Sequence, residues 1–372
     1  MLWLLMVIII ALSVAISSNI IIVSSTTIDK VKNHTNYSNK NTNTNNNNNN
    51  NFTLACNISI IACLDNNPTY LQKIEAHNIQ IDSILSQVNS TQLKEYVDIL
   101  SSFHTRNTKS NYIDKVAYWL KNELENLCEG RVFFHYYTQN DPNQTFNLKN
   151  IICSKQNLAS SSSDYNKTII IGAHYDSRAE ILNNTNTRAP GADDNASGVS
   201  SLLELVRILS PLNLKYNLEF VLFSGEEQGL WGSEHYVKYL DNNNRTKTID
   251  LYINFDMLGY TPSNETNKVI LEYDVGNKNV QNDKYSKTIG QFIKEIASNY
   301  TDLEAILSKL ENSDFIPFEA LGHTVIGIHD GGVKKNPHYH KSSDMPDTLN
   351  IEYLTSITKM VLATILELDN LR

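Results

Sequence analysis

Residues 168–176 read TIIIGAHYD, and they give the clearest indication of the fold class. The run from Thr168 to Ala173 is dominated by isoleucine, which is typical of a strand buried on both faces of a sheet. His174 and Asp176 follow at once, so polar side chains begin where the strand ends. The stretch therefore predicts a central strand with functional side chains at its carboxyl end.

Strand-like and helix-like segments alternate through the rest of the chain. Apolar spacing predicts further strands at 131–137, 147–153, 218–223, 251–255, 269–273 and 324–328. It predicts helices at 91–103, 112–127, 199–209, 235–240, 285–296, 315–321 and 351–368. This alternation indicates an α/β fold: a single domain, Asp65–Arg372, with a mostly parallel central sheet covered by helices on both faces.

Composition excludes two broad classes of protein. The chain has 372 residues, of which 41% are apolar, and this supplies enough material for a core and excludes wholesale disorder. The formal net charge is −9, from 31 basic and 40 acidic residues. Without a basic excess to neutralise phosphates, a nucleic-acid partner is not expected.

The N-terminal segment, residues 1–25, is expected to direct the chain out of the cytoplasm. No charged side chain occurs from Met1 to Val23, and Leu2–Ile16 is strongly apolar. Two interpretations are open: a signal peptide, with Ala15 and Ser17 fitting cleavage after Ser17, or a single membrane anchor. Both predict an extracytoplasmic protein, either secreted or anchored by this segment.

Residues 26–64 are rich in asparagine, which predicts a low-complexity linker between the N-terminal segment and the domain that begins at Asp65. Acceptor sequences of the form Asn-x-Ser/Thr are frequent, which suits a glycoprotein. Examples begin at Asn33, Asn36, Asn51, Asn57, Asn89, Asn143, Asn166, Asn244, Asn264 and Asn299.

Four cysteines are present, and none forms a Cys-x-x-Cys pair, which disfavours thiolate zinc sites and redox motifs. Three pairings of four cysteines are open. Proximity in the sequence favours Cys56–Cys63 and Cys128–Cys153, with free buried thiols as the alternative.

Polar residues follow several of the predicted strands, where an α/β sheet usually carries its site. These segments read His174-Tyr175-Asp176, Ser224-Gly225-Glu226-Glu227 and Asn254-Phe255-Asp256. Two further polar segments are Gly191-Ala192-Asp193-Asp194 and Asn336-Pro337-His338-Tyr339-His340. Imidazoles and carboxylates without thiols suit two divalent ions, zinc first. A two-metal hydrolytic site needs a bridging carboxylate and a separate base, and an adjacent Glu-Glu pair can provide the base beside a ligand.

Together these segments resemble the zinc aminopeptidases of metallopeptidase family 28. The resemblance runs from Thr91 to the final helix and includes the opening Leu100–Arg106, LSSFHTR. It implies a zinc exopeptidase-like fold and two Zn²⁺ ions per chain. The residues that it implies are His174 and Asp256 for one zinc, Glu227 and His340 for the other, Asp194 as the bridge, Glu226 as general base, Tyr339 as hydrogen-bond donor to the oxyanion, and Asp176 to orient His174.

The reaction implied by this resemblance is hydrolysis of the first peptide bond of peptides with a free N-terminus. One departure is Phe315 in Ser313-Asp314-Phe315, where many members of the family have histidine. The departure affects a detail of the pocket and removes no ligand.

Three alternatives compete with an aminopeptidase. A glutaminyl cyclase-like acyltransferase uses one zinc and differs around the bridging aspartate, where this chain has Asn195-Ala196-Ser197-Gly198. A carboxypeptidase-like relative needs a cationic pocket, which Arg178 or Arg188 could supply. A non-catalytic binding ectodomain usually lacks ligands, and here every ligand is present.

Overall fold

The computed structural model of the chain describes residues 59–66, 78–142, 144–157, 166–182, 184–262, 267–331 and 336–372. The predicted signal peptide or anchor at 1–25 lies outside the described residues, as does Cys56. No described helix combines the length and the apolar character needed to cross a membrane.

Within the described part of the chain, eight strands form one mixed sheet in the order β1-β2-β4-β3-β5-β8-β6-β7. Their bounds are β1 Arg131–Asp141, β2 Gln144–Lys155, β3 Thr168–His174, β4 Asn217–Phe223, β5 Ile249–Phe255, β6 Lys268–Tyr273, β7 Glu304–Lys309 and β8 Val325–His329. The central strands β4, β3, β5 and β8 are parallel to their neighbours within that group. The β1–β2 hairpin adds antiparallel strands at one edge, and β6 runs antiparallel to β8. The predicted α/β fold with a mostly parallel sheet is confirmed.

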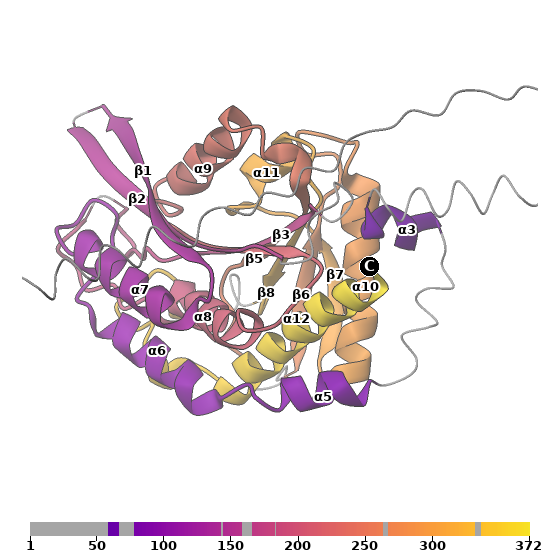
Figure 1. Cartoon of the computed structure of the whole chain (residues 1–372). Helices are drawn as coiled ribbons and strands as arrows, with labels where there is room; N and C mark the ends of the chain where they lie inside the picture. The colour runs from indigo at the N-terminus through magenta and orange to yellow at the C-terminus, as the bar shows by residue number, and fades with distance from the viewer. Residues whose placement is uncertain are drawn as a thin grey trace, which may run out of the picture. The chain divides into compact units, whose positions relative to one another are not determined.

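Helices cover both faces of this sheet (Figure 1). Their bounds are α3 Ile60–Asn66, α5 Ile79–Leu85, α6 Ser90–Ser102, α7 Ile113–Leu127, α8 Gly198–Leu209, α9 Trp231–Asn242, α10 Asp283–Tyr300, α11 Ile316–Ala320 and α12 Ile351–Leu371. Strand β3 shows why both faces need a cover. Its Ile169 and Ile171 pack into the larger core with α8 and α12, whereas Ile170 packs on the other face with residues of α9 and α11.

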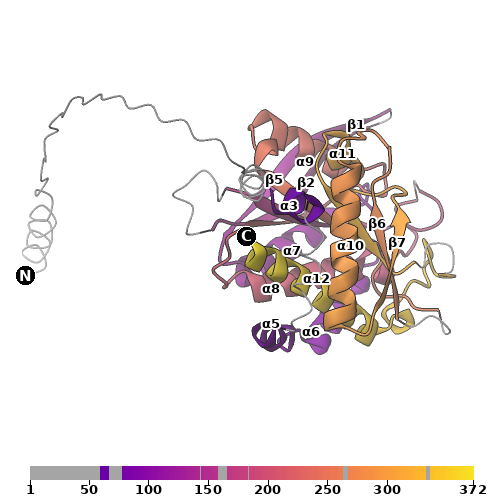
Figure 2. The ribbon, with the colours of Figure 1, turned by 90° about the vertical axis from the view of Figure 1, so that its right-hand side faces the viewer.

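Helix α3, Ile60–Asn66, begins inside residues 26–64, for which composition predicts a linker. It lies beside α10 (Figure 2), and the side chains of Ile60, Ile61 and Leu64 are buried in the larger core. Burial of these three side chains removes apolar surface from water, which stabilises the helix on the core. We therefore propose that the α/β domain begins by Ile60, not at Asp65, and that the linker ends before it.

One of the two predicted disulfides is present. Cys128, just after α7, is bonded to Cys153 in β2, with the Cα atoms 6.3 Å apart. The bond joins the end of a helix to the strand beneath it. The predicted pair Cys56–Cys63 involves a residue outside the described ones and stays a prediction.

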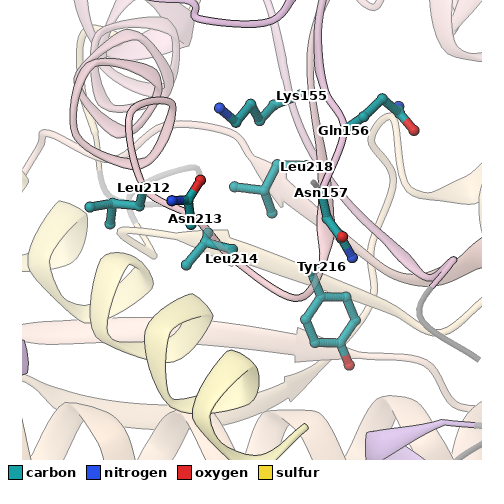
Figure 3. A pocket seen from close by; sticks show the side chains of 8 residues that line it. All are labelled: Lys155, Gln156, Asn157, Leu212, Asn213, Leu214, Tyr216 and Leu218. Atoms are coloured by element: carbon teal, nitrogen blue, oxygen red, sulfur yellow. The ribbon is translucent and has the colours of Figure 1, made fainter. Parts of the chain in front are cut away.

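The cavities at the two ends of the parallel strands differ greatly in volume. At the amino end of β4, Tyr216 and Leu218 line a hollow of about 10 Å³ with the end of β2 (Figure 3), which is room for about one water molecule. At the carboxyl ends of the parallel strands lies a cleft of about 660 Å³. Only the cleft has the size of a ligand site.

Candidate metal centre

Three neighbouring parallel strands bring the predicted ligands together. In the sheet, His174 of β3 pairs with Phe223 of β4, and Ala173 pairs with Phe255 of β5. The chain segments that leave these strands therefore start at one edge of the sheet. His174, the Glu226-Glu227 pair and Asp256 therefore lie close together at the carboxyl ends of the strands, where the sequence predicts them.

Two clusters of ligand atoms result, and they share Asp194. His174 Nε2 lies 3.3 Å from Asp194 Oδ1 and 3.3 Å from Asp256 Oδ1. His340 Nε2 lies 3.0 Å from Asp194 Oδ2 and 3.1 Å from Glu227 Oε2. One oxygen of Asp194 thus faces each histidine, which is the geometry of a bridging carboxylate.

The donor set fits zinc. Each cluster offers one imidazole nitrogen and carboxylate oxygens, which are common zinc ligands, and Glu227 Oε1 is buried without a hydrogen-bond partner. The carboxylates favour positive charge at the centre: although burial opposes the shift, Asp194 and Glu227 raise the pKa of His340 to about 9. Burial alone would raise the pKa of the Asp194 carboxyl group, but His174 and His340 outweigh this effect and lower the pKa below its ordinary value.

Asp194 is held from both sides by backbone and side-chain contacts. It lies in the turn Ala192–Ser197 that leads into α8. The carboxylate of Asp344 accepts hydrogen bonds from the backbone N–H groups of Asp193 (3.0 Å) and Asp194 (3.2 Å). The side chain of Asn195 donates to the carbonyl of Phe255, 2.8 Å away, and so joins this turn to the end of β5.

Asp176 supports two parts of the site at once. Its Oδ1 lies 3.5 Å from His174 Nδ1, the ring nitrogen opposite the metal-facing Nε2. Its carboxylate also accepts from the backbone N–H groups of Glu226 and Glu227, each at 3.3 Å, and from Thr108 Oγ1 at 2.8 Å. The buried Asp176 carboxylate therefore contacts both the ring of His174, a predicted ligand, and the turn that carries the two glutamates.

Arg106 is a further positioning residue, and its role was not predicted. Its guanidinium is fully buried and donates to the carbonyls of Tyr175 (2.9 Å), Gly191 (2.8 Å) and Pro190. Tyr175 follows His174, and Gly191 lies three residues before Asp194, the predicted bridge. The sequence signal was the opening Leu100–Arg106, but the partners of Arg106 lie far along the chain.

Asp256 has its own supporting chain of hydrogen bonds. Ser313 Oγ donates to Asp256 Oδ2 at 2.7 Å and accepts from Asn254 Nδ2 at 3.0 Å. Tyr252 OH in turn donates to Asn254 Oδ1 at 2.7 Å. Phe315 stands where many members of the resembled family have histidine. It is buried in the smaller hydrophobic core, on the face of the sheet covered by α9 and α11, and it lines the cleft.

Glu226 and Tyr339 both line the cleft beside the two clusters. Burial raises the pKa of Glu226 well above its ordinary value, against the opposing effect of His174. Burial and the neighbouring carboxylates, Asp194 first, also raise the pKa of Tyr339, so its hydroxyl keeps its proton at neutral pH. The site therefore combines a carboxyl group suited to proton transfer with a hydroxyl donor.

Known proteins resemble this chain in sequence and in fold. The model of peptidase family M28 matches residues 154–365. A probable zinc metalloprotease of Pyrenophora tritici-repentis is 27% identical over 344 residues, which cover 78% of this chain and 76% of that protein. Leucine aminopeptidase 1 of Paracoccidioides brasiliensis is 27% identical over 299 residues, which cover 78% of this chain and 73% of that protein.

Among solved structures, LapB of Legionella pneumophila has a similar fold. The TM-score is 0.65 with 24% identity, over 79% of this chain and 75% of that one. The family model matches more than half of the chain, and the fold and the clustered residues agree with it. The chain belongs to peptidase family M28.

Proposed function

We propose that the protein is an aminopeptidase that uses two zinc ions to remove N-terminal residues from peptides. His174 and Asp256 would hold one ion, Glu227 and His340 the other, and Asp194 would bridge them. The observation that carries the proposal is Asp194, whose two oxygens lie 3.3 Å from one histidine and 3.0 Å from the other. A carboxylate with a histidine on each side is what a two-metal site requires.

Bound zinc would polarise the peptide carbonyl and make a water molecule more acidic. Glu226 would take the proton of the attacking water and return it to the leaving amine. A raised pKa suits this double role, because the carboxyl group must both accept and release a proton near neutral pH. Asp176 would keep Glu226 in position through its backbone N–H.

Tyr339 would donate a hydrogen bond to the oxygen that becomes negative as the carbonyl is attacked. Its side chain lines the cleft, and its ring is stacked on His340 with the centroids 3.6 Å apart. A hydroxyl that stays protonated can donate throughout the reaction, and such donors stabilise the transition state.

The acidic character of the site favours a free α-amino group. Glu226, Glu227, Asp194 and Asp256 line the same cleft, and their oxygens can accept hydrogen bonds from a free α-amino group but not from an acylated one that lies against the metals. Two of the relatives bear the names leucine aminopeptidase 1 and probable zinc metalloprotease, which agree with this reaction.

Contacts of the two arginines argue against a carboxypeptidase. Arg178 Nε donates to Glu227 Oε2 at 2.8 Å, and Arg188 donates to the sulfur of Met345. Arg178 is thus engaged with a carboxylate of the site, and a substrate carboxylate would have to compete with Glu227 for it. A cyclase with one zinc would not need a second histidine and carboxylate on the far side of Asp194.

We also propose that the protein acts outside the cytoplasm, carried there by residues 1–25 as a signal peptide or a membrane anchor. The disulfide Cys128–Cys153 supports this location, because disulfides persist in oxidising compartments. N-linked glycosylation at the Asn-x-Ser/Thr sites would follow.

Paired substrates test the proposed reaction. The purified protein, loaded with zinc, should hydrolyse an aminoacyl amide and leave its N-acetylated form nearly untouched. Loss of one charge-assisted contact lowers the rate by about 10- to 100-fold before steric blocking is added. Equal hydrolysis of the two substrates would exclude an aminopeptidase, and a requirement for a free carboxylate would indicate a carboxypeptidase.

A further inference from the structure

The floor of the cleft beyond the metal ligands is a row of residues from four neighbouring strands. Asn254 of β5 pairs with Gly327 of β8, Gly327 pairs with Glu272 of β6, and Glu272 pairs with Ser308 of β7. All four line the cleft. In-register neighbours point to the same face of a sheet, so the row leads from the metal side toward Glu272 and Ser308.

Gly327 lets Phe315 and the carboxylate of Glu272 lie close to the floor of the cleft. A Cβ atom at this position would lie 3.0 Å from Phe315 Cε1 and 3.2 Å from Glu272 Oε2. A larger side chain would therefore displace Phe315 or the carboxylate of Glu272. The Glu272 carboxylate thus extends over β8, toward Asn254 and the metal side of the cleft.

Glu272 places a negative charge in the groove that this part of the cleft forms. Its Oε1 lies 3.3 Å from His329 Nε2. The backbone N–H of Gly331 donates to Nδ1 of the same ring at 2.8 Å, so the single ring proton lies on Nε2 and the ring is neutral. Although Glu272 raises the pKa of His329 against the effect of burial, protonation would require the ring to give up the Gly331 bond.

The dimensions and walls of the groove fit a long side chain with a charged end. The Glu272 carboxylate lies over Gly327, one strand spacing, about 5 Å, from Asn254. An extended lysine side chain spans about 6 Å from its Cα to its ammonium nitrogen. Ile270 and Phe315 line the groove and can cover the methylene groups of such a chain, while its charged end reaches Glu272.

We infer that this groove binds the side chain of the substrate's N-terminal residue and that Glu272 selects lysine and arginine there. The inference rests on the proposed aminopeptidase function and adds the substrate class. The inferred preference differs from the one in the name of the leucine aminopeptidase relative.

Unmodified protein gives the first test. The full chain, loaded with zinc, is assayed with lysyl, arginyl, leucyl and norleucyl reporter amides; the norleucyl side chain is the lysine side chain without its ammonium group. We expect kcat/KM for lysyl amide to exceed that for norleucyl amide by about 10- to 100-fold, as one charge-assisted contact would give. Free L-lysine should also inhibit more strongly than free L-norleucine, which measures binding without turnover.

Variants locate the preference. Glu272→Gln should lower the lysyl-to-norleucyl ratio by about 10- to 100-fold, and Glu272→Leu should make it favour norleucine. Glu304→Gln removes the same charge from an exposed position of β7, outside the cleft, and should leave the ratio unchanged.

The outcomes separate this inference from the proposed function. Hydrolysis of leucyl or norleucyl amide in preference to lysyl and arginyl amides would overturn the inference and leave the aminopeptidase standing. A lysine preference that Glu272→Gln does not reduce would also overturn it. Failure to hydrolyse any free aminoacyl amide would contradict the proposed function itself.

Discussion

Replacement of Arg106 with methionine removes a buried guanidinium that joins three segments beside the metal centre. Arg106 donates to the carbonyls of Leu100 (3.1 Å), Tyr175 (2.9 Å), Gly191 (2.8 Å) and Pro190. Burial lowers its pKa to about 10, so the group is still charged at neutral pH. Methionine fills much of the volume but supplies no donor.

The expected cost follows from these acceptors. Each buried carbonyl left without a donor costs about 1–3 kcal/mol, but removal of a buried charge offsets part of the sum. A net loss of about 3–5 kcal/mol in the free energy of unfolding is expected, as for other broken buried charge networks. Each kcal/mol lowers Tm by about 2–4 °C in a domain of this size class, so Tm should fall by roughly 10 °C.

Thermal unfolding and zinc affinity measured on the same samples test this reasoning. Zinc affinity should fall by about 10- to 100-fold, because the segments that carry Asp176 and Asp194 lose their shared anchor. The matched control is Arg188→Met, since Arg188 contacts the sulfur of Met345 and should change stability by less than about 0.5 kcal/mol. A loss below about 1 kcal/mol for Arg106→Met would refute the assigned role.

Three further changes probe the base, the disulfide and the support of Asp256. Glu226→Gln should keep its zinc, measured by elemental analysis, and lose turnover by about 100- to 10,000-fold; near-normal turnover would place the base elsewhere. Serine at both Cys128 and Cys153 should cost about 2–4 kcal/mol in urea unfolding, and an unchanged midpoint would count against a stabilising bond. Ser313→Ala removes the 2.7 Å bond to Asp256 and should weaken zinc binding about 10-fold in competition with a chelator; unaltered affinity would show that the bond is dispensable.

The pattern of apolar residues predicts the centre of the fold better than its edges. Strands β3, β4 and β5 are almost wholly buried, so their sequences are continuous apolar runs that are easily read. Strand β7, Glu304–Lys309, was not predicted, because it lies at the sheet edge and Ala305 alone is buried in it. Beyond residue 137, β1 continues through mostly exposed positions to Asp141 and pairs there with β2, so burial leaves little trace in its sequence.

In the candidate site, residues that belong to a short motif could be predicted from the sequence, whereas residues defined by contacts distant in the chain could not. Four of the five predicted ligands follow a strand or precede a helix, and His340 lies in a short polar turn, so a local motif is enough to suggest each of them. Arg106 and Asp344 depend on contacts that no local motif encodes. Arg106 and Gly191 are 85 residues apart, and Asp344 and Asp194 are 150 residues apart. The assigned roles of the ligands, of Glu226 and of Tyr339 stay predictions.

The number of zinc ions per chain tests the central claim most directly. Asp194 lies between two histidine-containing clusters, so the purified protein, saturated with zinc and freed of excess metal, should contain about two zinc ions per chain. Asp194→Ala should reduce the content of both sites, whereas His340→Ala should empty mainly one. Saturation of the unmodified protein at one zinc ion per chain would contradict the two-metal site.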